Sequence, residues 1–262
     1  MKHLKAWMLL FCAAAAVYYW STDGFYLARI KVPLLESIDP LAADVLIPNS
    51  FHYLGKGHQT FVFESGNIVL KLFDANHLKE PWRESKKAWW RERIRIYPES
   101  YPLAYRLLQK QTGVLLVHLG KSDRIFPTIE LVDKIGRRFQ LDLNSVPFVL
   151  QTKGKNSFYQ SLKTAAPQDR KQLIDAYLAF QQQRIELCIA DHDRDIEHNY
   201  CWDGKILQYI DPARCFFEPS LKEDARRKKE WWKATHRLRM WLDRYHPEEL
   251  VFFDEEYGRR AS

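Results

Sequence analysis

The stretch that decides the fold lies in the second half of the chain: residues 191–199 read Asp-His-Asp-Arg-Asp-Ile-Glu-His-Asn, and residues 210–213 read Ile-Asp-Pro-Ala. Asp211 follows Asn199 by twelve residues, and the Asp-Gly pair at 203–204 between them is typical of a hairpin turn. A hairpin here returns Asn199 and Asp211 to one point. The amide and carboxylate oxygens that meet there are ligands of the kind that Mg²⁺ takes.

Two further pieces precede this stretch. Residues 54–63 read Leu-Gly-Lys-Gly-His-Gln-Thr-Phe-Val-Phe, which places Gly55 and Gly57 in a turn between two expected strands. Glycines let backbone N–H groups approach a phosphate without obstruction by Cβ. Lys71 follows Gly57 by fourteen residues within the strand-like run Val-Leu-Lys-Leu, so its ammonium projects from one strand face. On its own, Lys71 also fits an ordinary surface strand.

Taken in chain order, the three pieces resemble the protein-kinase-like superfamily, which includes aminoglycoside phosphotransferases and small lipopolysaccharide-core kinases. The resemblance spans roughly residues 50–217. It implies an α+β, two-lobed protein-kinase-like fold with a β-rich N-lobe and a helical C-lobe. It also implies the cofactors ATP and Mg²⁺. By residue, it implies that nucleotide contacts come from Gly55, Gly57, Thr60 (in place of a third glycine) and Lys71, and metal contacts from Asn199 and Asp211.

The catalytic aspartate is harder to place, because the register of the loop departs from the family pattern. The family has this aspartate five residues before the asparagine, whereas Asp193 precedes Asn199 by six and Asp195 precedes it by four. We prefer Asp193, since residues 191–193 then overlay the His-Arg-Asp triplet, with an aspartate in place of the histidine.

Two other departures bear on activity. The metal-binding Asp-Phe-Gly triplet reads Asp-Pro-Ala at 211–213, and proline stiffens that site. The glutamate expected to pair with Lys71 is either Glu92 or Glu99. The first hypothesis is therefore an ATP- and Mg²⁺-dependent phosphotransferase acting on a hydroxyl of a sugar, glycan, small molecule or protein. The alternative is a catalytically inactive kinase-like domain used for binding or scaffolding at a membrane.

The N-terminus carries a hydrophobic leader. Residues 6–22 are uncharged and follow Lys2 and Lys5. As a helix they span about 25 Å, the short end of a bilayer crossing, with aromatic residues near both ends. We predict a single-pass membrane anchor within residues 1–23, with its side of the membrane left open. The alternatives are a cleaved signal peptide, with the alanines at 14–16 as its cleavage site, and a buried core helix.

Composition narrows the function classes. The 262 residues carry 40 Lys and Arg against 33 Asp and Glu, a net charge of +7. The excess lies in tracts 83–95 and 226–239, where tryptophans are interleaved, but no nucleic-acid-binding motif accompanies them. We therefore expect amphipathic helices there and no nucleic-acid partner. Four cysteines, one of them in the leader, argue against a disulfide framework.

The remaining organisation follows from periodicity. We expect a linker at 24–48, the nucleotide-binding lobe at 49–151 and the helical lobe at 152–262. Strands are expected over 51–54, 60–64, 67–73, 114–119, 128–132, 138–143, 148–151 and 206–210. Helices are expected over 78–97, 100–112, 168–189 and 221–245, with the first two joined near Pro98 and Pro102. A rival reading of one loop makes it a zinc site formed by Cys188, His192, His198 and Cys201.

Overall fold

The computed structural model describes residues 2–32, 41–42, 45–79, 81, 83–120, 122 and 125–261. The chain forms two compact units, one made of residues 1–82 and 115–151 and the other of residues 83–114 and 152–262. The first is built on one large sheet and the second is mainly helical, so the fold is mixed α and β with the strand-rich part first.

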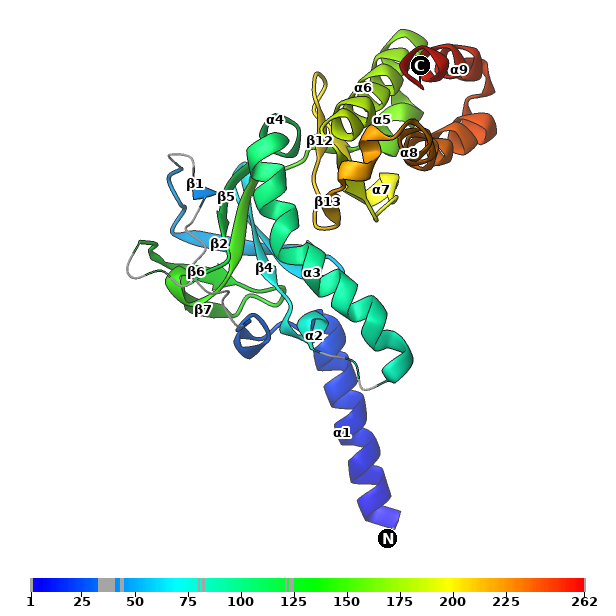
Figure 1. The fold of residues 1–262 in the computed structure, drawn as a ribbon. Coiled ribbons are helices and arrows are strands. Elements are labelled where there is room, and N and C mark those ends of the chain that lie inside the picture. The colour runs from blue at the N-terminus through cyan, green and yellow to red at the C-terminus, as the bar shows by residue number, and fades with distance from the viewer. Residues whose placement is uncertain are drawn as a thin grey trace. The chain divides into compact units, whose positions relative to one another are not determined.

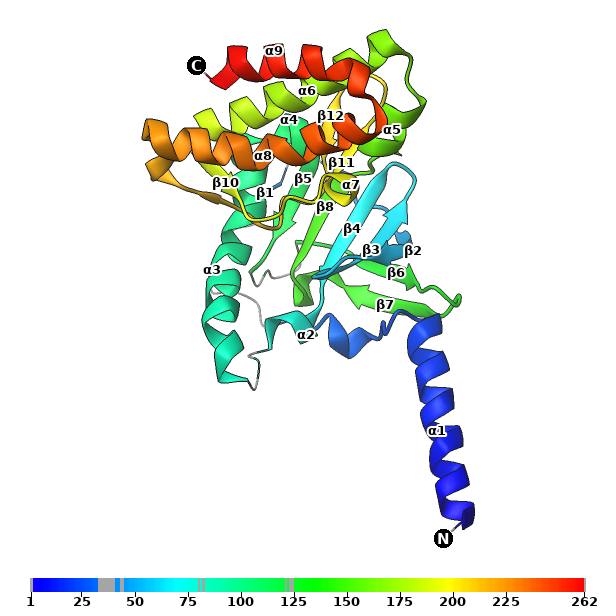
Figure 2. The same cartoon turned by 90° about the vertical axis from the view of Figure 1, so that its right-hand side faces the viewer.

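The sheet unit contains eight strands in the order β1-β5-β8-β4-β3-β2-β6-β7 (Figures 1 and 2). The central strands β2, β3 and β4 are antiparallel neighbours, while β2 pairs with β6 in parallel, Ser50 lying opposite Glu130. Alternate side chains of these strands, among them Phe61 and Leu70, are fully buried in one hydrophobic core. The bounds are β1 Leu41–Ala42, β2 Ser50–Lys56, β3 Thr60–Ser65, β4 Ile68–Phe73, β5 Val114–His118, β6 Thr128–Val132, β7 Arg138–Asp142 and β8 Phe148–Thr152. The strands expected over these residues are confirmed to within two residues at each end, because alternation and turn residues marked them clearly.

The leader forms a helix, α1 (Lys2–Ser21), which extends away from the sheet in both views (Figures 1 and 2). Its large apolar side chains, such as Trp7, Phe11 and Trp20, are exposed. Within the part of the chain that the structure describes, no helix has the length and apolar character needed to cross a membrane. The prediction of a single-pass membrane anchor is therefore wrong. The uncharged run is shorter than the roughly 20 residues of a typical span, and its C-terminal end is made of polar-tipped aromatic residues.

The helical unit is organised around three helices that lie side by side, α6, α8 and α9 (Figures 1 and 2). Their shared core includes Tyr177, Leu178, Leu238, Leu242 and Phe253. The helices are α3 Glu84–Leu107, α4 Gln109–Thr112, α5 Phe158–Thr164, α6 Pro167–Glu186, α7 Ile196–Asn199, α8 Asp224–Tyr245 and α9 Leu250–Ala261. The strands are β9 Asn156–Ser157, β10 Ile189–Asp191, β11 Tyr200–Trp202, β12 Leu207–Tyr209 and β13 Cys215–Phe217. Short turns of helix complete the chain: η1 Leu27–Arg29, α2 Ala75–Leu78, η2 Leu143–Ser145, η3 Pro219–Lys222 and η4 Pro247–Glu249.

One helix differs from the expected pattern. Instead of two helices joined at prolines, α3 continues through both Pro98 and Pro102 as a single 24-residue helix. Proline removes a backbone donor and usually bends or ends a helix. Here the second half of α3 is held by packing, since Tyr101 and Ala104 are fully buried and the Ser100 hydroxyl donates to the Cys215 carbonyl at 2.7 Å.

Candidate functional site

The glycine-containing turn connects β2 to β3 in the sheet unit. The Gly57 N–H donates to the Thr60 carbonyl at 2.9 Å, which closes the turn. The Gln59 carbonyl accepts a hydrogen bond of 2.8 Å from the Asp74 N–H, just beyond β4. The turn is therefore fixed by backbone contacts at its base. Gly57 lies in the turn itself, whereas Gly55 is in β2, opposite Val62, and Thr60 is the first residue of β3.

Lys71 lies in β4, a central strand of the sheet, opposite Val62 of β3. Its neighbours Leu70 and Leu72 point into the hydrophobic core of this unit. Because successive side chains of a strand alternate between faces, Lys71 projects from the other face. Only 7% of Lys71 is exposed, so its ammonium does not sit on an ordinary solvated strand.

The loop after β10 is shaped by three aspartates that repeat one local contact. The Asp191 carboxylate accepts from the Asp193 N–H at 2.7 Å, and the Asp193 carboxylate accepts from the Asp195 N–H at 3.0 Å. Asp195 in turn caps α7 by accepting from the His198 N–H at 3.2 Å and from the His198 ring at 2.8 Å. Such side-chain-to-backbone bonds fold a loop locally. Asp195 thus serves as a helix cap, whereas Asp193 is half-buried in the middle of the loop.

Asp191 belongs to the interior of the helical unit. Its second carboxylate oxygen accepts a 2.7 Å hydrogen bond from the Tyr209 hydroxyl. Burial raises the pKa of Asp191 to about 6, against the lowering effects of Arg184 and the Tyr209 hydroxyl. Since this carboxylate is engaged on both oxygens, it braces the loop and is a poor candidate for a group that meets substrate.

A buried ion pair between Arg184 and Glu230 supports the start of the same loop. Arg184 of α6 is 1% exposed and donates to the Ile189 carbonyl at 2.6 Å and to Glu230 of α8 at 3.1 Å. The same Glu230 oxygen accepts from the Asp191 N–H at 3.2 Å. Arg184 and Glu230 were not anticipated from the sequence. The available signal was a charged residue within the apolar stripe of each helix, next to Ile185 in one and Trp231 in the other.

The expected hairpin between Asn199 and Asp211 is confirmed. Strands β11 and β12 pair antiparallel with Tyr200 opposite Tyr209, and the Ile210 N–H donates to the Asn199 carbonyl at 2.8 Å. The hairpin therefore brings the residue before Asp211 into direct contact with Asn199. The Asn199 side chain is 3% exposed, and its amide nitrogen is buried without a hydrogen-bond partner among the described residues.

Asp211 has a neighbour that the sequence did not indicate. The fully buried phenol of Tyr101, in α3, lies beside it. Burial and the Asp211 carboxylate both raise the pKa of Tyr101 well above its usual range. Tyr101 therefore stays protonated, with a hydroxyl able to donate to Asp211 and fix its orientation.

The predicted residues fall into two sets. Gly55, Gly57, Thr60 and Lys71 belong to the sheet unit, and Asp193, Asn199 and Asp211 belong to the helical unit. Within the second set, Asn199 and Asp211 are joined by the hairpin, and both offer oxygen donors of the type that Mg²⁺ prefers. Of the two glutamates considered for Lys71, Glu99 is exposed on α3, and the side chain of Glu92 lies outside the described residues.

The residues of the rival zinc reading do not gather. His192 is exposed and stacks on Phe216 with ring centroids 4.6 Å apart, while exposed His198 is bonded to Asp195. Cys188 and Cys201 are buried. In the described part of the chain, no group of three or more Cys, His, Asp or Glu side chains is placed to hold a metal ion.

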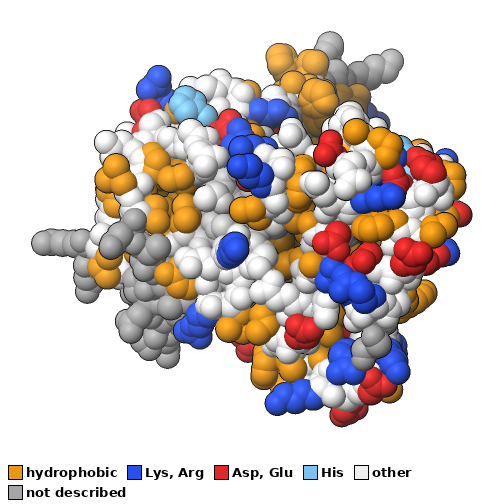
Figure 3. All heavy atoms as spheres, turned by 90° about the horizontal axis from the view of Figure 1, so that it is seen from above, with side chains coloured by type: hydrophobic (Ala, Val, Ile, Leu, Met, Phe, Trp, Pro, Cys, Tyr) orange, Lys and Arg blue, Asp and Glu red, His pale blue; other side chains and the backbone are white. Residues whose placement is uncertain are grey.

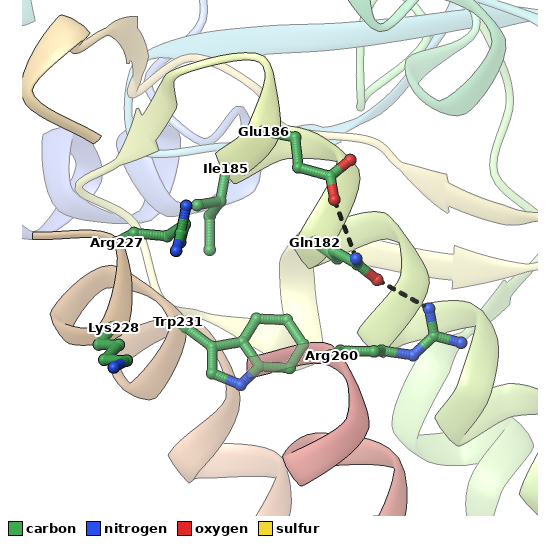
Figure 4. A pocket seen from close by; sticks show the side chains of 7 residues that line it. All are labelled: Gln182, Ile185, Glu186, Arg227, Lys228, Trp231 and Arg260. Carbon is green, nitrogen blue, oxygen red and sulfur yellow. Dashed lines mark hydrogen bonds between the residues drawn. The ribbon is translucent and has the colours of Figure 1, made fainter. Parts of the chain in front are cut away.

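A cavity of about 160 Å³ lies between α6, α8 and α9 (Figure 4). Of the cations that line it, Arg227 and Lys228 both pair with Asp224, and Arg260 pairs with Asp175 and Gln182. None of the predicted site residues lines it. On the face shown in Figure 3, basic and acidic side chains are likewise interspersed, with no single-sign surface.

No protein-family model matches the chain, and no curated protein matches its sequence. Solved structures that resemble it include the bifunctional kinase-methyltransferase WbdD, at 12% identity and a TM-score of 0.38, over 78% of this chain and 42% of that one. A complex of WbdD with a kinase inhibitor gives 11% identity and a TM-score of 0.40, over 80% and 45%. A high-resolution WbdD structure gives 12% and 0.41, over 80% and 45%. The chain therefore spans less than half the length of these proteins, and a likeness of this degree carries no statement about its function.

Proposed function

We propose that this protein is a protein-kinase-like phosphotransferase that uses ATP and Mg²⁺ and phosphorylates a hydroxyl group. The observation that carries the proposal is the hairpin contact between the Ile210 N–H and the Asn199 carbonyl, 2.8 Å long. This backbone contact joins Asn199 to the residue before Asp211, which supports the proposal that the Asn199 amide and the Asp211 carboxylate act together. Phosphoryl transfer from ATP needs such a pair to hold magnesium against the phosphates.

The glycine turn supports the nucleotide part of the proposal. A Cβ added at Gly55 would meet nothing within 4 Å, and one added at Gly57 would meet only Thr60, at 3.4 Å. Neither position has the positive φ that calls for glycine. Local packing and a left-handed backbone therefore do not account for the glycines at the end of β2 and in the turn. A phosphate group approaching the backbone accounts for them, because a side chain would block its access to the amides.

The remaining roles follow from chemistry. Lys71 would carry its charge to the α- and β-phosphates, and burial makes that ammonium more effective than an exposed one. Asp193 would accept the proton of the acceptor hydroxyl as its oxygen bonds to the γ-phosphorus and the bond from that phosphorus to the β,γ-bridging oxygen breaks, releasing ADP. Asp195 is a poorer candidate because it caps α7. Magnesium, held by Asn199 and Asp211, would supply neutralisation of phosphate charge.

The experiment measures the thermal stabilisation of the protein by millimolar Mg·ATP and then phosphate transfer to a panel of hydroxyl acceptors. Wild type is expected to be stabilised. Asp211→Asn should lose the stabilisation, and the matched change Asp254→Asn, at an exposed position of α9, should keep it. Asp193→Asn should keep the stabilisation and lose transfer.

Two results speak against an active enzyme. If wild type is not stabilised by Mg·ATP, the proposal is wrong. If wild type binds Mg·ATP but neither hydrolyses it nor transfers phosphate, the inactive kinase-like domain is correct. The Asp-Pro-Ala triplet at 211–213, which replaces the family's Asp-Phe-Gly, is the observation that favours this second function.

A further inference from the structure

The segment that follows α1 is part of the interior of the sheet unit. Phe25 and Ile30 are fully buried in the same core as the central strands. The Phe25 ring meets Phe61 and Phe63 of β3 edge to face, at centroid distances of 5.2 and 5.1 Å. Such pairs prefer this geometry and add to the free energy of burial. Residues 22–30 thus pack beneath the hairpin that ends in the glycine turn.

Within this segment, Arg29 makes a buried ion pair with Asp74. Its Nε and Nη2 atoms donate to the two carboxylate oxygens at 2.8 and 2.7 Å, and its Nη1 donates to the Gly24 carbonyl at 2.8 Å. Arg29 is 5% exposed and Asp74 is fully buried. Gly24 has a φ of +71°, and a Cβ there would lie 2.3 Å from Arg29 Nη1. The backbone at Gly24 is therefore shaped to receive this guanidinium.

Asp74 connects the ion pair with Arg29 to the glycine turn through two contacts. Its backbone N–H donates to the Gln59 carbonyl at 2.8 Å, and its carboxylate lies 3.5 Å from the Lys56 ammonium. Lys56 and Arg29 also lie over the ring of Phe61, at 5.1 and 5.2 Å from its centroid. The two ends of the turn, Lys56 and Gln59, are thus both tied to Asp74, Lys56 through the carboxylate and Gln59 through the backbone N–H. We refer to Arg29, Asp74 and Lys56 as the turn clamp.

We infer that Arg29 and Asp74 are positioning residues that hold the amides of residues 56–60 in the arrangement that binds the triphosphate of ATP. This inference rests on the proposed function. A short turn at the end of a hairpin is otherwise among the more mobile parts of a domain, and ordering it upon binding weakens affinity. A bidentate guanidinium–carboxylate pair out of contact with water fixes the base of the turn before the nucleotide arrives. The segment that joins α1 to the sheet would then belong to the nucleotide site.

The test uses the whole chain and two readouts. The first is hydrogen–deuterium exchange of the turn, without nucleotide, at the Gly57 and Asp74 amides. The second is the KM for Mg·ATP, measured separately from kcat. The main variant is Arg29→Met with Asp74→Asn, which removes both charges at similar volume and leaves no unpaired buried ion. Lys56→Met leaves the buried pair intact and removes the charge that contacts Asp74.

The control is Arg138→Ala, which breaks an exposed pair with Glu130 elsewhere in the same sheet. In the double variant we expect at least a tenfold faster exchange at both amides, a KM for Mg·ATP raised by about tenfold and a smaller change in kcat. Lys56→Met should accelerate exchange less, and the single variant Arg29→Lys, which keeps a cation beside the intact Asp74 carboxylate, should retain part of the protection. The control should match wild type.

The outcomes separate the two proposals. If exchange at Gly57 and Asp74 in the double variant stays within twofold of wild type, the clamp does not hold the turn and the inference is wrong. If exchange rises while KM is unchanged, the clamp holds the turn but does not position it for ATP, and the inference is again wrong. If wild type itself binds no Mg·ATP, the phosphotransferase proposal fails, and the exchange data alone decide whether the clamp fixes the turn.

Discussion

Removing the carboxylate of Glu230 should destabilise the helical unit strongly, and by more than the loss of an exposed carboxylate does. In Glu230→Ala, Arg184 loses the carboxylate oxygen that lies 3.1 Å from its Nη1 atom. The Asp191 N–H loses the same oxygen, its acceptor at 3.2 Å. Arg184 is 1% exposed, so its charge stays buried with one fewer counter-charge. Breaking one side of a buried ion pair costs about 3–5 kcal/mol, and we expect a loss in that range.

The assay is urea unfolding followed by far-ultraviolet circular dichroism. The matched control is Asp254→Ala, which breaks the pair with Arg239 in which both side chains are about half exposed. Exposed pairs contribute about 0–1 kcal/mol, so the control should lie close to wild type. Glu230→Gln, which keeps an acceptor oxygen, should fall between the two. A Glu230→Ala protein that is no less stable than Asp254→Ala would refute the assignment of the Arg184–Glu230 pair as the support of the loop.

Two further predictions concern stability. Both ring nitrogens of His118 are buried without hydrogen-bond partners among the described residues, and burial lowers its pKa from 6.5 to about 4. The unfolded chain, in which His118 keeps its ordinary pKa, therefore binds a proton at a higher pH than the folded chain does. The free energy of unfolding should fall by on the order of 3 kcal/mol as the pH drops from 6.5 to about 4. His118→Leu should reduce that loss, as urea unfolding across the range would show; an unchanged pH dependence contradicts it. Gly113→Ala should cost well over the ~1 kcal/mol of left-handed strain, because its φ is +63° and a Cβ would lie 1.9 Å from Thr152 Oγ1. Gly66→Ala, with a φ of +58° and open space around it, should cost only the strain, and equal losses in thermal unfolding would rule out the clash.

The strands and the hairpin were predictable because their signals are local. Alternating side chains mark β2 to β4, and the Asp-Gly pair at 203–204 marks the turn between β11 and β12. The continuation of α3 through Pro98 was not predictable, since it depends on burial of Tyr101 and on contact with a strand more than a hundred residues later, at Cys215. Helices α5 and α9 were missed for a similar reason, because each packs its short apolar face against α6.

The candidate site also contains residues that could be predicted from local patterns and residues that could not. The residues expected to contact ATP were named from the resemblance of short motifs to the protein-kinase-like superfamily, and they stay a prediction. The residues that hold them in place were not, because their contacts join distant parts of the sequence. Arg29 and Asp74 are 45 residues apart, and Arg184 and Glu230 are 46 apart. A buried charge in an apolar helical stripe is a usable signal for the second pair, since such a charge requires a partner. The sequence around Arg29 and Asp74 shows no such pattern.

The order of the two units along the chain has a consequence for synthesis. The sheet unit is interrupted by residues 83–114, and its β2–β6 ladder joins Ser50 to Glu130. That ladder cannot form until the later strand has left the ribosome, and contacts of such long range form slowly. The hairpin that joins Asn199 to Ile210 spans only a dozen residues and can close within about 1–10 μs of emerging. The Asn199–Ile210 hairpin is thus assembled from neighbours along the chain, whereas the sheet unit is complete only when its distant segments meet.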